Sequence, residues 1–165
     1  MIDGIFKLYR EDITMKTIFA YDPWRLVENE LVNTAGVYTV DLADFERKLT
    51  EEHVKVFLLC SPHNPVGRVW RREELAAMLE LCRVHGVYVI SDEIHHDFTH
   101  GGHKHIPAAT VGEYDDMLVT LTAPSKTFNL AGLQTSNIFI LNRTLRKTFK
   151  KAIDQAGYSQ LNTLG

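Results

Sequence analysis

The sequence lacks the features that mark secreted, membrane-spanning or strongly charged proteins. Its 165 residues include two cysteines, Cys60 and Cys82, both in apolar segments, so we expect two reduced core thiols and no disulfide framework. No apolar run approaches the length that crosses a bilayer, and the N-terminal residues show no signal-peptide pattern. The net charge of -3 gives no reason to expect nucleic acid or an anionic membrane as a partner. A cytoplasmic protein is therefore expected.

The composition and length are those of an ordinary globular domain. Apolar residues make up 45% of the chain and charged residues 24%, and neither repeats nor low-complexity segments occur. Because a chain of this length can bury a substantial core, we expect residues 1–165 to form a single domain.

Apolar runs and helical periodicities predict an α/β fold, with a mostly parallel sheet flanked by helices. The segment 54–92 is one strand–loop–helix–strand unit, which implies a parallel pair with a right-handed crossover. Residues 1–16 mix charged and apolar residues without a clean period. The predicted strands are 18–21, 25–32, 38–40, 54–60, 87–90, 117–122 and 136–141, and the predicted helices are 41–49, 71–85 and 143–156.

Polar residues follow three of the predicted strands at the points where the strands end. Asn64, Asp92 and Lys126 each lie at or a few residues past the end of a buried apolar run. Ligands of open α/β sheets bind outside the carboxyl ends of the strands. An amide, an acid and an amine are therefore expected to converge at one edge of the sheet.

Each of these residues has a plain alternative. Lys126 is either a solvated surface charge or, in a desolvated pocket, an amine that attacks carbonyls and forms Schiff bases. Asn64 either belongs to a simple turn or presents an amide held between two prolines. Asp92 is either a strand-end cap or a buried acid that holds a proton on a heterocyclic nitrogen. The segment 92–95 also matches the DExH pattern of helicases, but the phosphate loop that this reading needs is absent from the sequence.

Five of the eight histidines fall between His95 and His105. Clusters of this kind can bind zinc or other transition metals, but this one has two glycines at its centre and no cysteine partner. Exposed loop histidines are the favoured interpretation, and no metal site is expected. His95 is the exception, because it lies three residues after Asp92 and can face the same site.

In combination, three motifs resemble the pyridoxal-phosphate enzymes of the class I/II aminotransferase family, fold type I. They are Ser-Pro-His-Asn-Pro-Val-Gly at 61–67, Val-Ile-Ser-Asp-Glu-Ile-His-His-Asp at 89–97 and Ala-Pro-Ser-Lys-Thr-Phe-Asn at 123–129. The second and third motifs are most similar to the cystathionine β-lyase, or C–S lyase, branch. The resemblance implies that the chain is a partial large domain of such an enzyme.

The resemblance also implies a role for each site residue. Lys126 would bind pyridoxal 5'-phosphate as a Schiff base and later carry the α-proton. Asp92 would pair with the protonated pyridine nitrogen. Asn64 and His95 would lie at the phenolic oxygen, and Ser125 would reach the phosphate. The peptide bond that follows Asn64 is expected to be cis, as in relatives.

The sequence departs from the family pattern in ways that affect function. Ala123 and Gln134 stand where many aminotransferases carry a phosphate-binding serine and arginine. Relatives are well over twice as long, so much of their active site has no counterpart here. The parent activity implied is β-elimination at a C–S bond, or amino transfer, on a small amino-acid substrate. The alternative is a non-catalytic remnant that binds no cofactor. Open sheet edges would favour a homo-oligomer.

Overall fold

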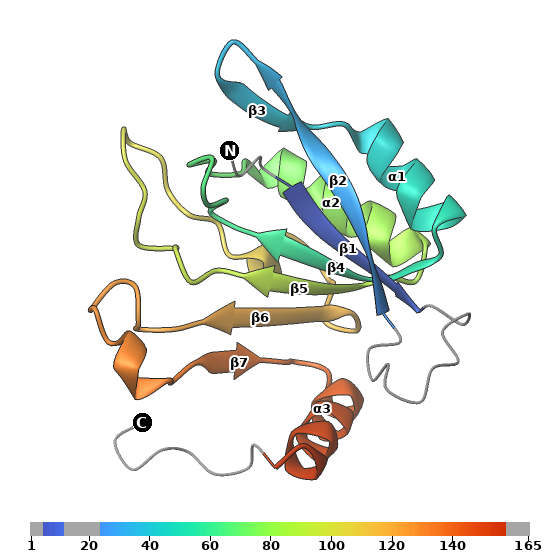
Figure 1. Ribbon diagram of the computed structural model, residues 1–165, viewed down its shortest axis with the longest axis vertical. Coiled ribbons are helices and arrows are strands. Elements are labelled where there is room, and N and C mark those ends of the chain that lie inside the picture. The colour runs from blue at the N-terminus through green and yellow to red at the C-terminus, as the bar shows by residue number, and fades with distance from the viewer. Residues whose placement is uncertain (1–4, 12–23, 158–165) are drawn as a thin grey trace.

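The computed structural model describes residues 5–11 and 24–157, which form one seven-stranded sheet with helices (Figure 1). In chain order the elements are β1 (Ile5–Glu11), β2 (Trp24–Thr34), β3 (Val37–Val40), α1 (Leu42–Glu51), β4 (Val54–Cys60), α2 (Arg72–Val84), β5 (Tyr88–Asp92), the short 3-10 helix η1 (Ala108–Thr110), β6 (Leu118–Thr122), the 3-10 helix η2 (Ala131–Leu133), β7 (Asn137–Phe139) and α3 (Arg143–Gln155).

The strands lie in the order β3-β2-β1-β4-β5-β6-β7. The pairs β4–β5 and β5–β6 are parallel, whereas β1 is antiparallel to both β2 and β4, and β7 is antiparallel to β6. Four strands, β2, β4, β5 and β6, therefore run in the same direction. The predicted α/β fold with a sheet flanked by helices is confirmed, and its parallel centre is the predicted strand–helix–strand unit.

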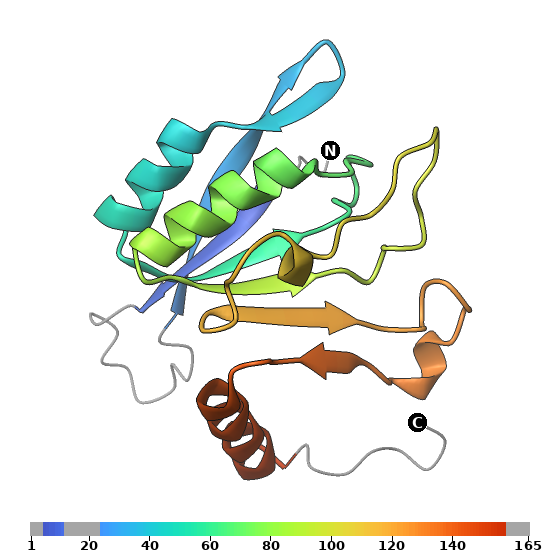
Figure 2. The same ribbon diagram turned by 180° about the vertical axis from the view of Figure 1, so that it is seen from behind.

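Helices α1 and α2 cover one face of the sheet, as Figure 2 shows from that side. The carboxylate of Asp41 begins α1 by accepting hydrogen bonds of 3.0 Å from the backbone N–H groups of Ala43 and Asp44. Gly86 has a φ of +66° just past α2, a left-handed conformation that ends the helix. These two caps set the ends of the predicted helices 41–49 and 71–85.

The core lies between this helical layer and the strands. Its fully buried members share the helix-facing side of β4 and β5 and the inward faces of the two helices. They include Phe45, Leu49, Phe57, Leu59, Leu75, Met78, Leu79, Cys82 and Val89. The rings of Phe45 and Phe57 meet edge to face with centroids 4.9 Å apart, which locks α1 onto β4.

Some expectations need correction or remain outside the described residues. The sequence did not predict β1, whose place depends on pairing with two strands that are distant along the chain. The strand expected at 18–21 lies outside the described residues. Both cysteines are free thiols, as expected; Cys82 is buried in α2, whereas Cys60 is only half-buried at the end of β4.

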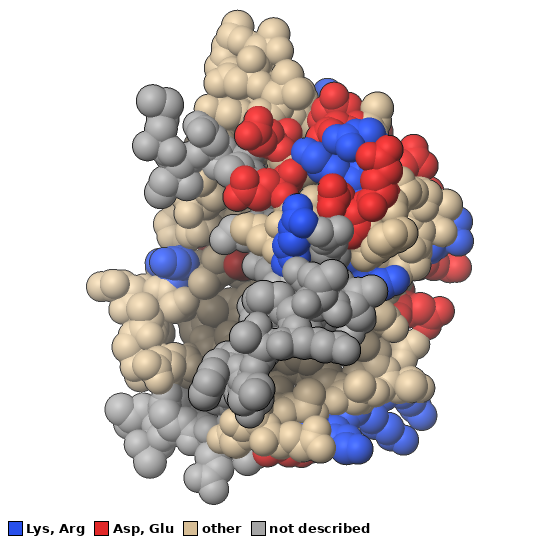
Figure 3. All heavy atoms as spheres, turned by 45° about the vertical axis from the view of Figure 1, so that its right-hand side comes forward, with Lys and Arg blue, Asp and Glu red and all other residues tan. Residues whose placement is uncertain are grey.

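Charge is distributed unevenly over the surface (Figure 3). Acidic side chains interleaved with basic ones gather over α1, and a basic group lies over α3. The basic residues of α3 are Arg143, Arg146, Lys147, Lys150 and Lys151. Within the described ranges, no helix is both long and apolar enough to cross a membrane.

Candidate functional site

The carboxyl ends of the parallel strands β4, β5 and β6 lie at one edge of the sheet, on the left in Figure 1. Cys60, the last residue of β4, is in register with Asp92, the last residue of β5, and Asp92 in turn is in register with Leu121. The loops that leave these strands therefore begin side by side. This edge is where the sequence predicted the site.

The loop after β4 is a tight turn that presents Asn64. The peptide bonds Ser61–Pro62 and Asn64–Pro65 are both cis, the second as expected from the resemblance. The backbone N–H of Asn64 donates to the Sγ of Cys60 at 3.4 Å, and the Cys60 thiol donates to the Pro62 carbonyl oxygen at 3.3 Å. The thiol thus holds the turn against the end of the strand.

A cavity of about 400 Å³ opens beside this turn, on the sheet face opposite α1 and α2. It brings together three of the predicted site residues, Asn64, Asp92 and His95. Its other lining residues are Leu58, Leu59, Cys60, His63, Ile90, Ile94 and Leu121. The cavity is therefore mainly apolar, with an amide, a carboxylate and imidazoles on its wall.

Asp92 takes the plain role of a strand-end cap, and it is exposed rather than buried as the functional alternative expected. Its Oδ1 accepts a hydrogen bond of 3.1 Å from the backbone N–H of Ile94, which orients the carboxylate. Its Oδ2 makes no hydrogen bond to the residues that the structure describes. The acid is thus fixed by the backbone through one oxygen, and its second oxygen is available to a ligand in the cavity.

Burial shifts the pKa of two other lining groups, Cys60 and His63, toward the neutral form. Burial raises the pKa of the Cys60 thiol, and the nearby Asp92 carboxylate raises it further. Burial also lowers the pKa of His63, whose ring packs edge to face against Trp70. No lysine or arginine is among the described lining residues. The cavity therefore presents the Asp92 carboxylate to whatever it holds, a setting that favours a positively charged group.

Lys126 and Ser125 lie in the neighbouring loop, after β6, and do not line this cavity. Lys126 is exposed, and its ammonium makes no hydrogen bond or ion pair with the described residues. The backbone carbonyl of Ser125 accepts from the N–H of Leu130 at 3.0 Å. The structure thus brings the predicted acid, amide and imidazole together and places the lysine one strand further along the same edge.

Sequence reasoning missed Glu93, a buried carboxylate that adjoins the site. Its Oε1 accepts hydrogen bonds of 2.9 Å from the Ser91 hydroxyl and from the backbone N–H of Ala108, and its Oε2 lies 2.9 Å from His105 Nε2. The one available signal was its position after Asp92, since side chains alternate between the two faces of a strand.

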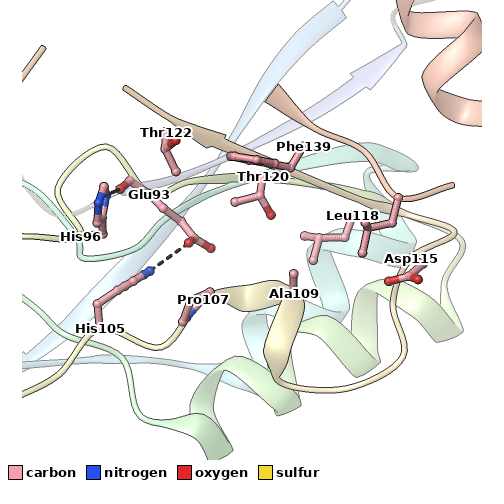
Figure 4. A pocket seen from close by; sticks show the side chains of 11 residues that line it. Glu93, His96, His105, Pro107, Ala109, Asp115, Leu118, Thr120, Thr122 and Phe139 are labelled. Carbon is pink, nitrogen blue, oxygen red and sulfur yellow. Dashed lines mark hydrogen bonds and ion pairs between the residues drawn. The ribbon is translucent and has the colours of Figure 1, made fainter. Parts of the chain in front are cut away.

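Glu93 and His105 also line a second cavity of about 350 Å³, on the same side of the sheet as the helices (Figure 4). In Figure 4 the hydrogen-bonded pair Glu93 and His105 lies at one end of this cavity and Asp115 at the other. Leu118, Thr120 and Phe139 lie between them. The histidine segment thus packs against a buried acid. Across the described part of the chain, no three His, Cys, Asp or Glu side chains gather as a metal-ion site.

The fold and the site define an α/β protein with a ligand cavity at the carboxyl edge of a parallel strand pair. A profile of the family described as "Aminotransferase class I and II" matches residues 21–162. Cystathionine beta-lyase PatB from Bacillus subtilis (strain 168) is 47% identical over 138 residues, which cover 83% of this chain and 36% of that protein. The chain belongs to the class I and II aminotransferase family.

Solved structures agree with this assignment. The crystal structure of cystalysin from Treponema denticola, which contains a pyridoxal 5'-phosphate cofactor, matches with a TM-score of 0.79 and 40% identity, covering 84% of this chain and 35% of that chain. A PLP-bound C-S lyase from Staphylococcus hominis matches with a TM-score of 0.74 and 41% identity, covering 78% of this chain and 33% of that one. The predicted resemblance to the C–S lyase branch of a pyridoxal-phosphate-dependent family is confirmed. The chain spans about a third of the length of these relatives.

Proposed function

We propose that this chain forms the cofactor-binding sheet edge of a pyridoxal-phosphate-dependent enzyme that acts on amino acids. The observation that carries the proposal is the cavity at the ends of β4 and β5, which gathers Asn64, Asp92 and His95 next to the Lys126 loop. When bound, pyridoxal phosphate supplies an aldehyde and an electron-withdrawing ring that stabilises negative charge at the substrate's α-carbon.

The chemistry of the lining residues fits this cofactor. The apolar walls suit an aromatic ring, and the free Oδ2 of Asp92 suits a protonated ring nitrogen. The Asn64 amide and the His95 imidazole can donate to an anionic ring oxygen. Asp92 would hold the proton on the ring nitrogen, because its negative charge attracts the positive charge of the protonated ring.

Lys126 would supply the amine that reacts with the aldehyde and would move a proton at the α-carbon of the substrate. Ser125 would donate its hydroxyl to the phosphate. Ala123 and Gln134 offer that phosphate no charge, so this segment would hold it by few contacts. We propose residues 1–165 as part of a single cofactor-binding large domain.

For the reaction, we propose β-elimination at a C–S bond of a cysteine-type amino acid, with amino transfer as the alternative. Support comes from the relatives named cystathionine beta-lyase and C-S lyase, which share 47% and 41% identity with this chain. A homo-oligomer is proposed as well, because the short edge strand β7 exposes Ile138 and Phe139. Free thiols at both cysteines support a cytoplasmic location.

The test is a titration of the purified chain with pyridoxal phosphate, followed by the visible absorbance of the lysine-bound cofactor. We expect a saturating band in the wild type that is lost in Lys126→Ala. Asp92→Asn should weaken binding roughly thirtyfold, because a hydrogen bond to a charged group contributes about 2 kcal/mol. Lys104→Ala and Asp115→Asn are matched controls, since both residues are exposed and lie outside the cavity.

A band of equal affinity in Asp92→Asn would contradict the role of that acid. A chain that gives no band at any cofactor concentration would be the non-catalytic remnant instead.

A further inference from the structure

One hydrogen bond joins the loop that carries Lys126 to the loop that follows β5. The Thr127 hydroxyl donates to Asp97 Oδ2 at 2.7 Å, across thirty residues of sequence. We infer that Asp97 is a positioning residue that holds the Lys126 loop beside the cavity through Thr127. The inference rests on the proposed role of Lys126 as the residue that binds the cofactor.

The Lys126 loop has its own internal bonds, but these shape it without attaching it to β5. The backbone N–H of Phe128 donates to the Pro124 carbonyl oxygen at 2.9 Å, and a second bond of 3.0 Å joins Leu130 to Ser125. Over residues 24–157, the bond between Thr127 and Asp97 is the one hydrogen bond between residues 123–130 and residues 93–98. Its loss would therefore free the loop to move relative to Asp92.

The ring of its neighbour His96 lies next to the Asp97 carboxylate. The Nε2 atom of His96 lies 3.3 Å from the same Asp97 Oδ2 that accepts the Thr127 hydroxyl. The other ring nitrogen, Nδ1, lies 2.8 Å from the backbone carbonyl oxygen of Glu93. Because a carbonyl oxygen only accepts, Nδ1 donates this bond, and the Nε2 edge is turned toward Asp97.

Glu93 anchors this set of contacts in the core. Its side chain is buried and is bonded to Ser91, Ala108 and His105, so the backbone carbonyl that orients His96 belongs to a rigid residue. Figure 4 shows His96 and His105 at the carbonyl and the carboxylate of Glu93, respectively. A continuous series of contacts thus runs from the core to the residue next to Lys126.

The half-exposed position of Asp97 agrees with a positioning role. Its side chain is 47% exposed, and it lines neither the cofactor cavity nor the core. A hydrogen bond at such a site contributes little to global stability. It can still select one arrangement of a loop, because the alternative arrangements differ by little free energy.

The test is hydrogen–deuterium exchange of the cofactor-free chain, measured on peptides that cover residues 123–130. We expect Thr127→Val to raise the exchange rates in this segment roughly fivefold, as loss of a hydrogen bond of ordinary strength predicts. Asp97→Ala should have the same effect. Thr127→Ser keeps the hydroxyl and should exchange at the wild-type rate. Thr99→Val is the control, since Thr99 lies two residues from Asp97 and its hydroxyl bonds no described residue.

A second readout follows trapping of pyridoxal phosphate on Lys126 by borohydride. Trapping at Lys126 should slow in Thr127→Val and recover in Thr127→Ser, whereas exchange in α2 and β4 stays unchanged in every variant. Equal exchange of residues 123–130 in the wild type and Thr127→Val would overturn the inference, even if the cofactor binds. Faster exchange without any cofactor binding would support the positioning contact and contradict the proposed function, so the two failures are distinct.

Discussion

Glu93 is a buried acidic residue that directly follows β5, at the edge of the sheet where the candidate site lies. Its carboxylate makes three contacts of 2.9 Å, to a hydroxyl, a backbone N–H and an imidazole. These contacts join the end of β5 to the segment that leads into η1. A buried carboxylate is tolerated only when its oxygens are satisfied, and here both are.

Glu93→Ala is expected to lower the free energy of unfolding by about 3 kcal/mol. The substitution leaves the Ala108 N–H, the Ser91 hydroxyl and the His105 ring without their acceptor in a dry environment. Urea unfolding measures the change. Glu73→Ala, at an exposed position in the first turn of α2, should change stability by less than about 0.5 kcal/mol.

If Glu93→Ala and Glu73→Ala unfold at the same urea concentration, Glu93 does not anchor this edge.

The sequence predicted some site residues and not others for a physical reason. Asn64 and Asp92 follow buried strands directly, so topology alone brings them to one edge. The partners of Glu93 arrive from a loop twelve and fifteen residues further on, and no pattern in the sequence specifies where that loop returns. The hydrogen bond between Thr127 and Asp97 could not be predicted from the sequence for the same reason.

At the scale of elements, the helices and central strands were predictable because their signals are local. Asp41 and Asn142 cap α1 and α3 through their own side chains, and the apolar run 54–60 forms β4. β1 was not predictable, because it is defined by antiparallel pairing to β2 and β4 rather than by its own pattern. Because β1 lies between β2 and β4, it separates the antiparallel pair β2–β3 from the parallel strands β4, β5 and β6.

Helix α1 carries a pH-sensitive contact with the sheet. The ammonium of Lys48, 2.6 Å from Asp44 Oδ2, holds the pKa of that carboxyl below its usual range. The same oxygen accepts a hydrogen bond of 2.9 Å from the amide of Asn29, which is fully buried in β2. A carboxylate with a depressed pKa stabilises the folded state above the unfolded pKa, about 3.9.

Asp44→Asn should therefore destabilise the protein at neutral pH by up to about 1 kcal/mol, since a partly exposed ion pair is screened by solvent. The difference from the wild type should shrink as the pH falls below about 4, through the folded pKa. Thermal unfolding at a series of pH values measures it. Asp115→Asn, at an exposed position, is the control for replacing an aspartate by asparagine. A constant Asp44→Asn difference down to pH values well below 4 would contradict the assignment.

At the scale of the whole molecule, the two faces of the sheet differ. Helices α1 and α2 cover one face (Figures 1 and 2). The cavity lined by Asn64, Asp92 and His95 lies on the opposite face, at the ends of β4 and β5. None of the residues of α3 is buried, although Leu145, Phe149 and Ile153 recur at helical spacing. The apolar side of α3 and the exposed strand β7 are the surfaces on which the proposed homo-oligomer would depend.

The central claim is that this sheet edge places Lys126 to react with pyridoxal phosphate. The most direct test is to incubate the chain with the cofactor, reduce it with borohydride and map the modified lysines by peptide mass spectrometry. We predict one dominant modified residue, Lys126, at cofactor concentrations that leave Lys104 and the lysines of α3 unmodified. Modification spread evenly over the exposed lysines, and unchanged in total by Lys126→Ala, would contradict it.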